Sequence, residues 1–87
     1  MTTTEYLAGR LVAEVDRQDR IHPGGYPADR DGLRLGLAAL EDETREAYDE
    51  WRVHRRVAGW GGLAGELLQV AGVAMRMYRS VVEEDPR

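Results

Sequence analysis

Two clusters of glycine and proline divide the chain and constrain its fold more than any other feature. The first cluster, at residues 22–27, holds two prolines and two glycines, and the second, at residues 58–62, holds three glycines. Residues of these types at such density end regular secondary structure. The segments that they separate predict helices at about residues 4–19, 32–56 and 62–83. At 87 residues the chain is expected to form one small domain, 1–87.

Each predicted helix carries an apolar row whose members are three or four residues apart, the spacing of one helix face. The rows are Leu7, Leu11 and Val15 in the first segment; Leu33, Leu37, Leu40, Thr44, Ala47 and Trp51 in the second; and Leu63, Leu67, Val70, Ala74, Met77 and Val81 in the third. Because the second break is short and rich in glycine, the last two rows are expected to face each other. The sequence therefore predicts an all-α fold, a three-helix domain with a long antiparallel helical hairpin.

The composition limits the core that three helices can build. Hydrophobic residues make up 43% of the chain and charged residues 32%, but there is no Phe, and only two Trp and four Tyr. A chain this short with an aliphatic core is marginally stable alone. We therefore expect a homo-oligomer, a dimer or tetramer, that completes a four-helix-type bundle. The small residues Ala64, Gly65, Ala71 and Gly72 would permit close approach of a neighbouring helix.

Charge and cysteine content exclude several classes of partner and site. The formal net charge is −4 and the pI is about 5.1, which argues against a dedicated binder of duplex DNA, because such proteins need a basic face. The absence of Cys excludes disulfides and thiolate metal sites and fits a reducing compartment. No apolar run has transmembrane length, and the N-terminus has no signal-peptide pattern. We therefore expect a cytoplasmic protein without a membrane partner.

Two pairs of oxygen-bearing side chains have the spacing of one helix face. Glu43 and Glu46 are three residues apart, as are Glu66 and Gln69, and each residue immediately precedes a member of its helix's apolar row. In an antiparallel hairpin both pairs therefore project from the same side. Three carboxylates and one amide would form an oxygen-rich patch of the kind that Mg²⁺ or Mn²⁺ prefers.

Two considerations weigh against such a patch. The Glu43–Glu46 pair is expected to lie about five residues farther from the turn than the Glu66–Gln69 pair, roughly 7 Å at the helical rise. Acidic residues beside an apolar row are also commonly a solvated flank, and residues 41–46 hold a surplus of Glu and Asp. The solvated flank is therefore the alternative interpretation of these residues.

At the same positions the chain resembles the MazG-like all-α nucleotide pyrophosphohydrolases, especially the short forms of phages and actinobacteria. Members of that family carry Glu-x-x-Glu on one helix and Glu-x-x-Asp on the next. Residues 40–47 here read LEDETREA and residues 66–74 read ELLQVAGVA, where the family typically has an acidic residue followed by VAAVA. Residues 17–20 and the glycine- and proline-rich loop after them also resemble the short forms. The resemblance covers roughly residues 10–80.

The resemblance implies a Mg²⁺-dependent cleavage of a nucleoside triphosphate into a monophosphate and pyrophosphate. It implies that Glu43, Glu46 and Glu66 are the catalytic residues and hold the metal, with Gln69 as a further ligand. The metal would neutralise phosphate charge and activate the attacking water. Gln69 departs from the family pattern, because an amide oxygen can bind Mg²⁺ but brings no negative charge and cannot act as a base.

Two further residues are candidates for substrate binding. Arg76 follows Gln69 by seven residues, hence on the same face two turns along, where a triphosphate could reach it; the alternative is a surface arginine. Gln18 continues the first apolar row, so its amide could point inward and hydrogen-bond a base edge, or instead cap a helix end.

Two rival functions remain open from the sequence. A catalytically decayed relative could serve as a small helical protein-interaction module, and the substitution at Gln69 favours that interpretation. A helix-turn-helix DNA binder is weakened by the net charge and by the lack of a basic recognition helix.

Overall fold

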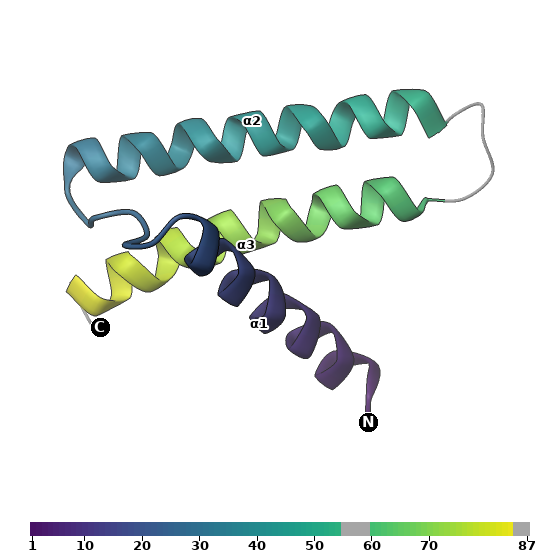
Figure 1. The fold of residues 1–87 in the computed structure, drawn as a ribbon, viewed down its shortest axis with the longest axis horizontal. Coiled ribbons are helices and arrows are strands. Elements are labelled where there is room, and N and C mark those ends of the chain that lie inside the picture. Colours follow the sequence, from purple (N-terminus) through teal and green to yellow (C-terminus); the bar gives the residue numbers. More distant parts are fainter. Residues whose placement is uncertain (55–59, 85–87) are drawn as a thin grey trace.

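The computed structural model describes residues 1–54 and 60–84, which form three helices and no strand: α1 (Thr3–Ile21), α2 (Arg30–His54) and α3 (Gly61–Glu84). α2 and α3 lie side by side and antiparallel, and α1 crosses α3 at an angle (Figure 1). The predicted all-α class and the antiparallel hairpin are confirmed. The expected helix bounds agree within two residues, except that the expected end at residue 56 lies outside the described residues. No described helix is long and apolar enough to cross a bilayer.

Local signals explain where the helices begin and end. The Thr2 hydroxyl accepts a hydrogen bond from the Glu5 amide at 3.1 Å, which caps α1. Asp29 Oδ1 accepts from the Gly32 amide at 2.7 Å and caps α2 in the same way. Between these helices the chain turns at Gly24 and Gly25, whose φ angles of 94° and 60° suit glycine best. The proline- and glycine-rich break therefore forms the corner between α1 and α2.

Glycines set how closely the helices approach. The backbones of α1 and α2 both approach α3 closely, whereas among the described residues no Cα atom of α1 lies within 8 Å of one of α2. A Cβ built on Gly72 would lie 2.5 Å from Gln18 Nε2 and 3.0 Å from Glu14 Cγ, so the crossing of α1 over α3 requires glycine there. A Cβ on Gly36 would lie 2.8 Å from Met77 Sδ, at the α2–α3 contact. The expected close approach is confirmed at Gly72, whereas a Cβ on Gly65 would meet nothing within 4 Å.

The predicted apolar rows of α2 and α3 do not face each other throughout, which corrects that part of the sequence interpretation. Leu37 and Leu67 belong to those rows, yet they are 58% and 53% exposed. On both helices, several of the better-buried residues lie one position before a member of the predicted apolar row. They include Glu43 on α2 and Glu66 on α3. The physical reason is that α3 must also present Gly72 and its neighbours to α1. That contact turns the carboxylate side of α3 inward.

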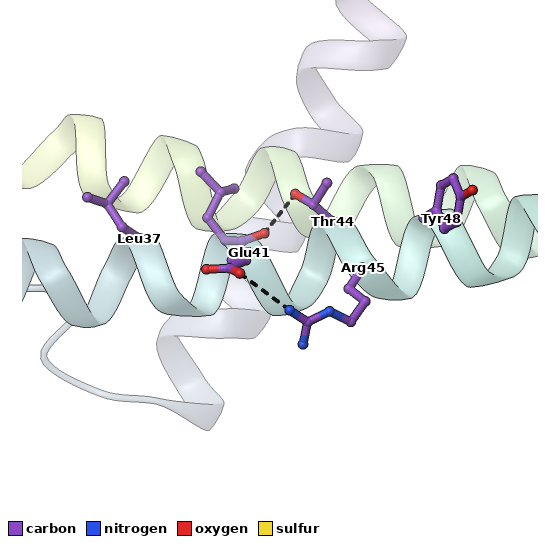
Figure 2. Close-up of a pocket in the computed structure, with 6 residues that line it drawn as sticks. Leu37, Glu41, Thr44, Arg45 and Tyr48 are labelled. Carbon is purple, nitrogen blue, oxygen red and sulfur yellow. Dashed lines mark hydrogen bonds and ion pairs between the residues drawn. The ribbon is translucent and has the colours of Figure 1, made fainter.

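The displacement leaves an apolar surface uncovered on the hairpin. On α2, a groove of about 530 Å³ is lined by Leu37, Leu40, Glu41, Thr44, Arg45 and Tyr48. Figure 2 shows Leu37, Thr44 and Tyr48 leaving α2 on the same side of the helix. On both helices the buried residues precede the predicted row, which leaves members of the row exposed. Since the helices are antiparallel, these exposed members face the same side of the hairpin. On α3 they include Leu67 and Val81. We call this surface the apolar flank.

The internal core is small. Among the described residues, the buried hydrophobic side chains are Val15, Ala47 and Val73. Glu14, Gln18 and Arg76 are buried as well, so polar side chains occupy much of the interior. Buried polar groups need partners, because an unsatisfied one costs free energy of unfolding. All three side chains accordingly make hydrogen bonds.

Candidate metal centre and adjoining pocket

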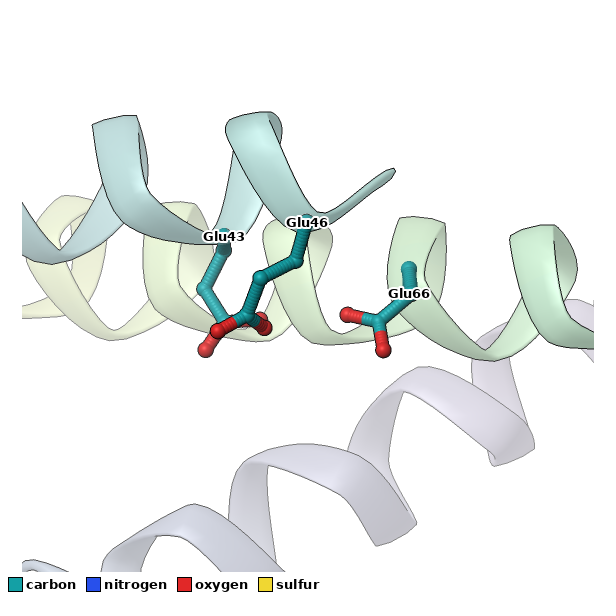
Figure 3. Close-up of side chains that lie close together, drawn as sticks. All are labelled: Glu43, Glu46 and Glu66. Atoms are coloured by element: carbon teal, nitrogen blue, oxygen red, sulfur yellow. The ribbon is translucent and has the colours of Figure 1, made fainter. Parts of the chain in front are cut away.

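Three glutamates from two helices converge. Each of Glu43, Glu46 and Glu66 offers a carboxylate oxygen, and these oxygens all lie within 4.8 Å of one another. Figure 3 shows Glu43 and Glu46 leaving α2 in the same direction, with the Glu66 carboxylate of α3 turned toward them. We call them the glutamate cluster. The convergence expected from an antiparallel hairpin is therefore present.

The axial offset between the two helices is smaller than the sequence suggested. Glu46 lies eight residues before the end of α2, and Glu66 lies five residues after the start of α3. The difference of three residues corresponds to about 5 Å along the helices. Glutamate side chains are long enough to span that distance, so no kink is needed to bring the carboxylates together.

The electrostatics of the glutamate cluster are unfavourable without a cation. Burial raises the pKa of Glu43, and the charges of Glu46 and Glu66 raise it further. Burial likewise raises the pKa of Glu66, with the charge of Glu46 adding to the effect. Glu43 Oε2 and Glu66 Oε2 are buried without a hydrogen-bond partner. A bound cation would compensate the charge and give both oxygens a partner.

The donor set suits a hard divalent ion. All three groups are carboxylates, which Mg²⁺ and Mn²⁺ prefer to the nitrogen and sulfur ligands of softer metals. Opposite ligands of an octahedral Mg²⁺ are about 4.2 Å apart, given metal–oxygen bonds of about 2.1 Å. The three oxygens lie within 4.8 Å of one another, so small side-chain rotations would bring them within that span. Water molecules would complete the coordination.

A polar pocket of about 280 Å³ adjoins the glutamate cluster where the three helices meet. Glu43 belongs to both, since its side chain also lines the pocket. We call this cavity the helix-junction pocket; its lining residues are Arg17, Gln18, Ile21, His22, Tyr26, Ala39, Glu43, Gln69, Val73 and Arg76. The predicted substrate-binding residues and two of the predicted metal ligands therefore lie around one cavity. Gln69 lines the pocket, and its role as a metal ligand stays a prediction.

Gln18 points inward, as its place in the apolar row of the first helix indicated. Its side chain is 6% exposed. Nε2 donates to Glu14 Oε2 at 2.7 Å and to the Gln69 carbonyl at 3.1 Å, which ties α1 to α3. The capping alternative does not describe the side chain, because the Gln18 contact that closes α1 is its main-chain carbonyl, which accepts from the His22 amide.

Arg76 is not the surface arginine of the alternative interpretation, because its side chain is 1% exposed. Its Nε donates to Asp19 Oδ1 at 2.9 Å and its Nη2 donates to the His22 carbonyl at 2.6 Å. The guanidinium also lies 5.2 Å from the centre of the Tyr26 ring, within cation–π range. Arg76 thus fixes the end of α1 and the following loop to α3, and it forms one wall of the helix-junction pocket.

Asp19 joins Arg76 to a second arginine. Arg79 donates to both Asp19 carboxylate oxygens, at 2.9 and 3.0 Å. The Arg79 hydrogen bonds, together with the one from Arg76, lower the pKa of Asp19 to about 2 against the opposing effect of burial. These contacts join Asp19 on α1 to residues of α3 that lie 57 and 60 positions later in the sequence.

Sequence reasoning missed Glu14 and Arg17. Glu14 is buried and accepts two hydrogen bonds from Arg17, at 2.7 and 2.9 Å, as well as the one from Gln18. The Arg17 hydrogen bonds lower the pKa of Glu14. The signal was present, since the three residues have the i, i+3 and i+4 spacing of neighbours on one helix face.

Comparison with protein-family models, with curated proteins and with solved structures found no match to this chain. None of these comparisons identifies a MazG-like family, so the resemblance rests on the motif residues alone.

Proposed function

We propose that the protein is a Mg²⁺-dependent nucleoside triphosphate pyrophosphohydrolase, with Mn²⁺ as an alternative ion. The observation that supports this most is the glutamate cluster, in which Glu43, Glu46 and Glu66 converge from two helices. In this proposal these three residues hold the metal and are the catalytic residues, with the Gln69 amide as a further ligand. The substrate is a nucleoside triphosphate, and the products are a monophosphate and pyrophosphate.

The adjoining pocket suggests how a nucleotide would be oriented. Because Glu43 lines both the pocket and the glutamate cluster, a nucleoside held in the pocket would place its phosphates beside the carboxylates. Gln18 would then contact the base, while Arg76 would keep the pocket wall in place. When bound, the metal would neutralise phosphate charge and lower the pKa of the attacking water. Hydrolysis would add that water to the α-phosphorus and release pyrophosphate.

Pyrophosphate release tests the proposal. Purified protein is incubated with a panel of nucleoside triphosphates and Mg²⁺, and pyrophosphate is measured. We expect turnover by the wild type and its loss in Glu43→Gln and Glu66→Gln. Glu41→Gln is the matched control, because Glu41 lies on the same helix but is exposed and pairs with Arg45 instead. A panel in which no nucleotide is cleaved would refute the enzyme proposal.

We also propose that the protein is a homo-oligomer in which apolar flanks pack together as a four-helix-type bundle. The support is the contrast between the small described core and the exposed leucines, valines and tyrosines of the hairpin. Leu37→Glu should weaken the oligomer, measured as mass by light scattering. Leu35→Glu makes the same change at an exposed leucine outside the groove and should leave the mass unchanged. A wild type that is monomeric at high concentration would contradict the proposal.

A second candidate is a catalytically decayed relative that acts as a helical interaction module. The neutral Gln69 and the exposed apolar flank favour it. The two candidates differ in one result: the module would lack nucleotide turnover at every metal concentration, whereas the enzyme would turn over at least one nucleotide.

A further inference from the structure

Three arginines share one face of α1. Arg10, Arg17 and Arg20 are spaced by seven and three residues, which places them along one side of the helix. They line a further pocket of about 240 Å³ between α1 and α3, which we call the arginine pocket. Its lining residues are Arg10, Ala13, Glu14, Arg17, Arg20 and Leu68. The pocket is basic although the formal net charge of the chain is −4.

The positive charge of the arginine pocket is only partly compensated. The acidic residue in its lining, Glu14, is buried, and its two oxygens accept hydrogen bonds from Arg17 and Gln18. Arg10 and Arg20 are exposed, and neither forms a hydrogen bond or an ion pair with another described residue. The pocket therefore carries two guanidinium groups that are available to a ligand.

These donors suit phosphate oxygens. Arginine offers five N–H donors in a planar fork that matches phosphate geometry, and it stays charged at physiological pH. Arg17 uses Nε and Nη2 for Glu14, so its Nη1 can still donate to a ligand. Arg76, by contrast, is 1% exposed and already bonded to Asp19 and His22. The arginine pocket is therefore more accessible to a phosphate group than Arg76 is.

Arg17 connects the arginine pocket to the glutamate cluster. Its side chain also lines the helix-junction pocket, as does that of Glu43. The hydrogen bonds to Glu14 raise the pKa of Arg17, and the charge of Glu43 contributes to that rise, so the two groups lie within electrostatic range. Figure 3 shows α1 passing the side of the hairpin on which the glutamate carboxylates lie. A phosphate chain held at the glutamate cluster would therefore have Arg17 next along its path.

We propose that the arginine pocket binds the pyrophosphate group of the substrate, its β- and γ-phosphates, with Arg10, Arg17 and Arg20 as donors. The proposal rests on the proposed nucleotide function for the identity of the anion. The glutamate cluster then lies at the α-phosphate. Water adds to the α-phosphorus, the bond from that phosphorus to the bridging oxygen breaks, and the arginine pocket holds the pyrophosphate that leaves.

Calorimetry with inorganic pyrophosphate tests the site without hydrolysis. The titration is done at pH 7.5 in EDTA, so that no divalent ion links the anion to the glutamates. We expect the wild type to bind pyrophosphate more tightly than sulfate. A variant with both Arg10→Gln and Arg20→Gln should bind pyrophosphate at least about tenfold more weakly, because it loses charge-assisted hydrogen bonds to the phosphate oxygens.

Arg34→Gln is the matched control. It makes the same change of charge at an exposed arginine of α2 that lines none of the three cavities described, so its affinity for pyrophosphate should equal that of the wild type. Arg17 is left in place in the double variant, because its loss would leave the buried Glu14 without its charged partner. Arg10 and Arg20 are exposed, so replacing them leaves the packing of α1 intact.

Three results would overturn the proposal. They are undetectable binding of pyrophosphate by the wild type, equal wild-type affinities for pyrophosphate and sulfate, and equal pyrophosphate affinities in the double variant and Arg34→Gln.

The outcome is separable from that of the proposed hydrolysis. Pyrophosphate binding that depends on Arg10 and Arg20, in a protein that cleaves no nucleotide, would refute the hydrolase and retain this inference. Nucleotide turnover by the wild type, with equal pyrophosphate affinities in the double variant and the control, would do the opposite.

Discussion

The carboxylates of Glu43 and Glu66 meet across the α2–α3 contact, although 22 residues lie between them in the sequence. Each has a buried oxygen without a partner, and burial raises the pKa of each. A solvated acidic flank would have neither property, because exposed carboxylates hydrogen-bond to water and repel one another weakly. The relationship therefore distinguishes these two glutamates from a solvated acidic flank.

Gln69→Glu should strengthen metal binding. The substitution restores the acidic residue that the resembling family carries, and it adds a negative charge to the pocket that Glu43 also lines. A ligand that binds only the folded state raises the unfolding midpoint, so the Mn²⁺-induced rise in Tm should be larger in the variant than in the wild type. Without metal the variant should be less stable, since another like charge is added. A smaller Mn²⁺ response in Gln69→Glu would argue against Gln69 as a ligand.

The glutamate cluster should make the metal-free protein less stable as the pH rises. Folding raises the pKa of Glu43 and Glu66 above the ordinary value of 4.5. The folded state therefore binds protons more tightly than the unfolded state, so the contribution of these groups is fully present below 4.5 and is lost as the pH rises through the raised values. Urea unfolding in EDTA at several pH values between 4.5 and 7.5 measures this.

Glu43→Gln serves as the comparison for that pH series. The variant cannot ionise at this position, so its stability should fall less between pH 4.5 and 7.5 than that of the wild type. Identical slopes in the two proteins would show that Glu43 ionises freely. With saturating Mn²⁺ the wild-type dependence should reverse, because protons then compete with the metal.

Asp19→Asn should destabilise the protein by roughly 1.5–3 kcal/mol, because it leaves the buried guanidinium of Arg76 without its charged partner. Asp42→Asn breaks an exposed pair with Arg45 and should cost at most about 0.5 kcal/mol. The pKa of Asp19 is lowered to about 2, so its contribution is present above the ordinary value of 3.8 and is lost as the pH falls toward 2. Chemical denaturation of both variants checks the ranking, and equal effects would contradict it.

Gly72→Ala should weaken the attachment of α1. Its Cβ would lie 2.5 Å from Gln18 Nε2, so either α1 or the hydrogen-bonded Gln18 side chain must shift, at a cost of about 1–3 kcal/mol. Gly65→Ala on the same helix meets nothing within 4 Å and should stabilise α3 by about 0.5–1 kcal/mol, through helix propensity alone. Urea unfolding of both variants measures the difference, and stabilisation by both substitutions would show that the crossing is not close.

The sequence was sufficient for the helices and for the glutamate cluster. Glycine and proline mark the breaks between the helices, and a spacing of three places Glu43 and Glu46 on one face. An antiparallel hairpin whose apolar rows face each other then brings Glu66 to the same side. The rows do not face each other throughout, but both are displaced in the same sense, so the three glutamates still converge.

The packing of α1 could not be predicted in the same way. It depends on the space left at Gly72 and on the bridge from Asp19 to Arg76, and no local pattern links residues so far apart. The same contact displaces the buried stripe of α3, which is why Leu67 is exposed although it belongs to the apolar row. Periodicity identifies the apolar face of a helix. When the helix packs against two neighbours, as α3 does, their contacts together determine which of its residues are buried.

Direct titration of Mn²⁺ into the metal-free protein tests the central claim most closely. Isothermal calorimetry at pH 7.5 should show binding to the wild type and to Glu41→Gln with equal affinity, and binding at least tenfold weaker in Glu66→Gln. The variant loses one of three carboxylate ligands, whereas the control loses an exposed carboxylate elsewhere on α2. Absence of Mn²⁺ binding in the wild type, or equal binding in all three proteins, would contradict a metal site formed by these glutamates.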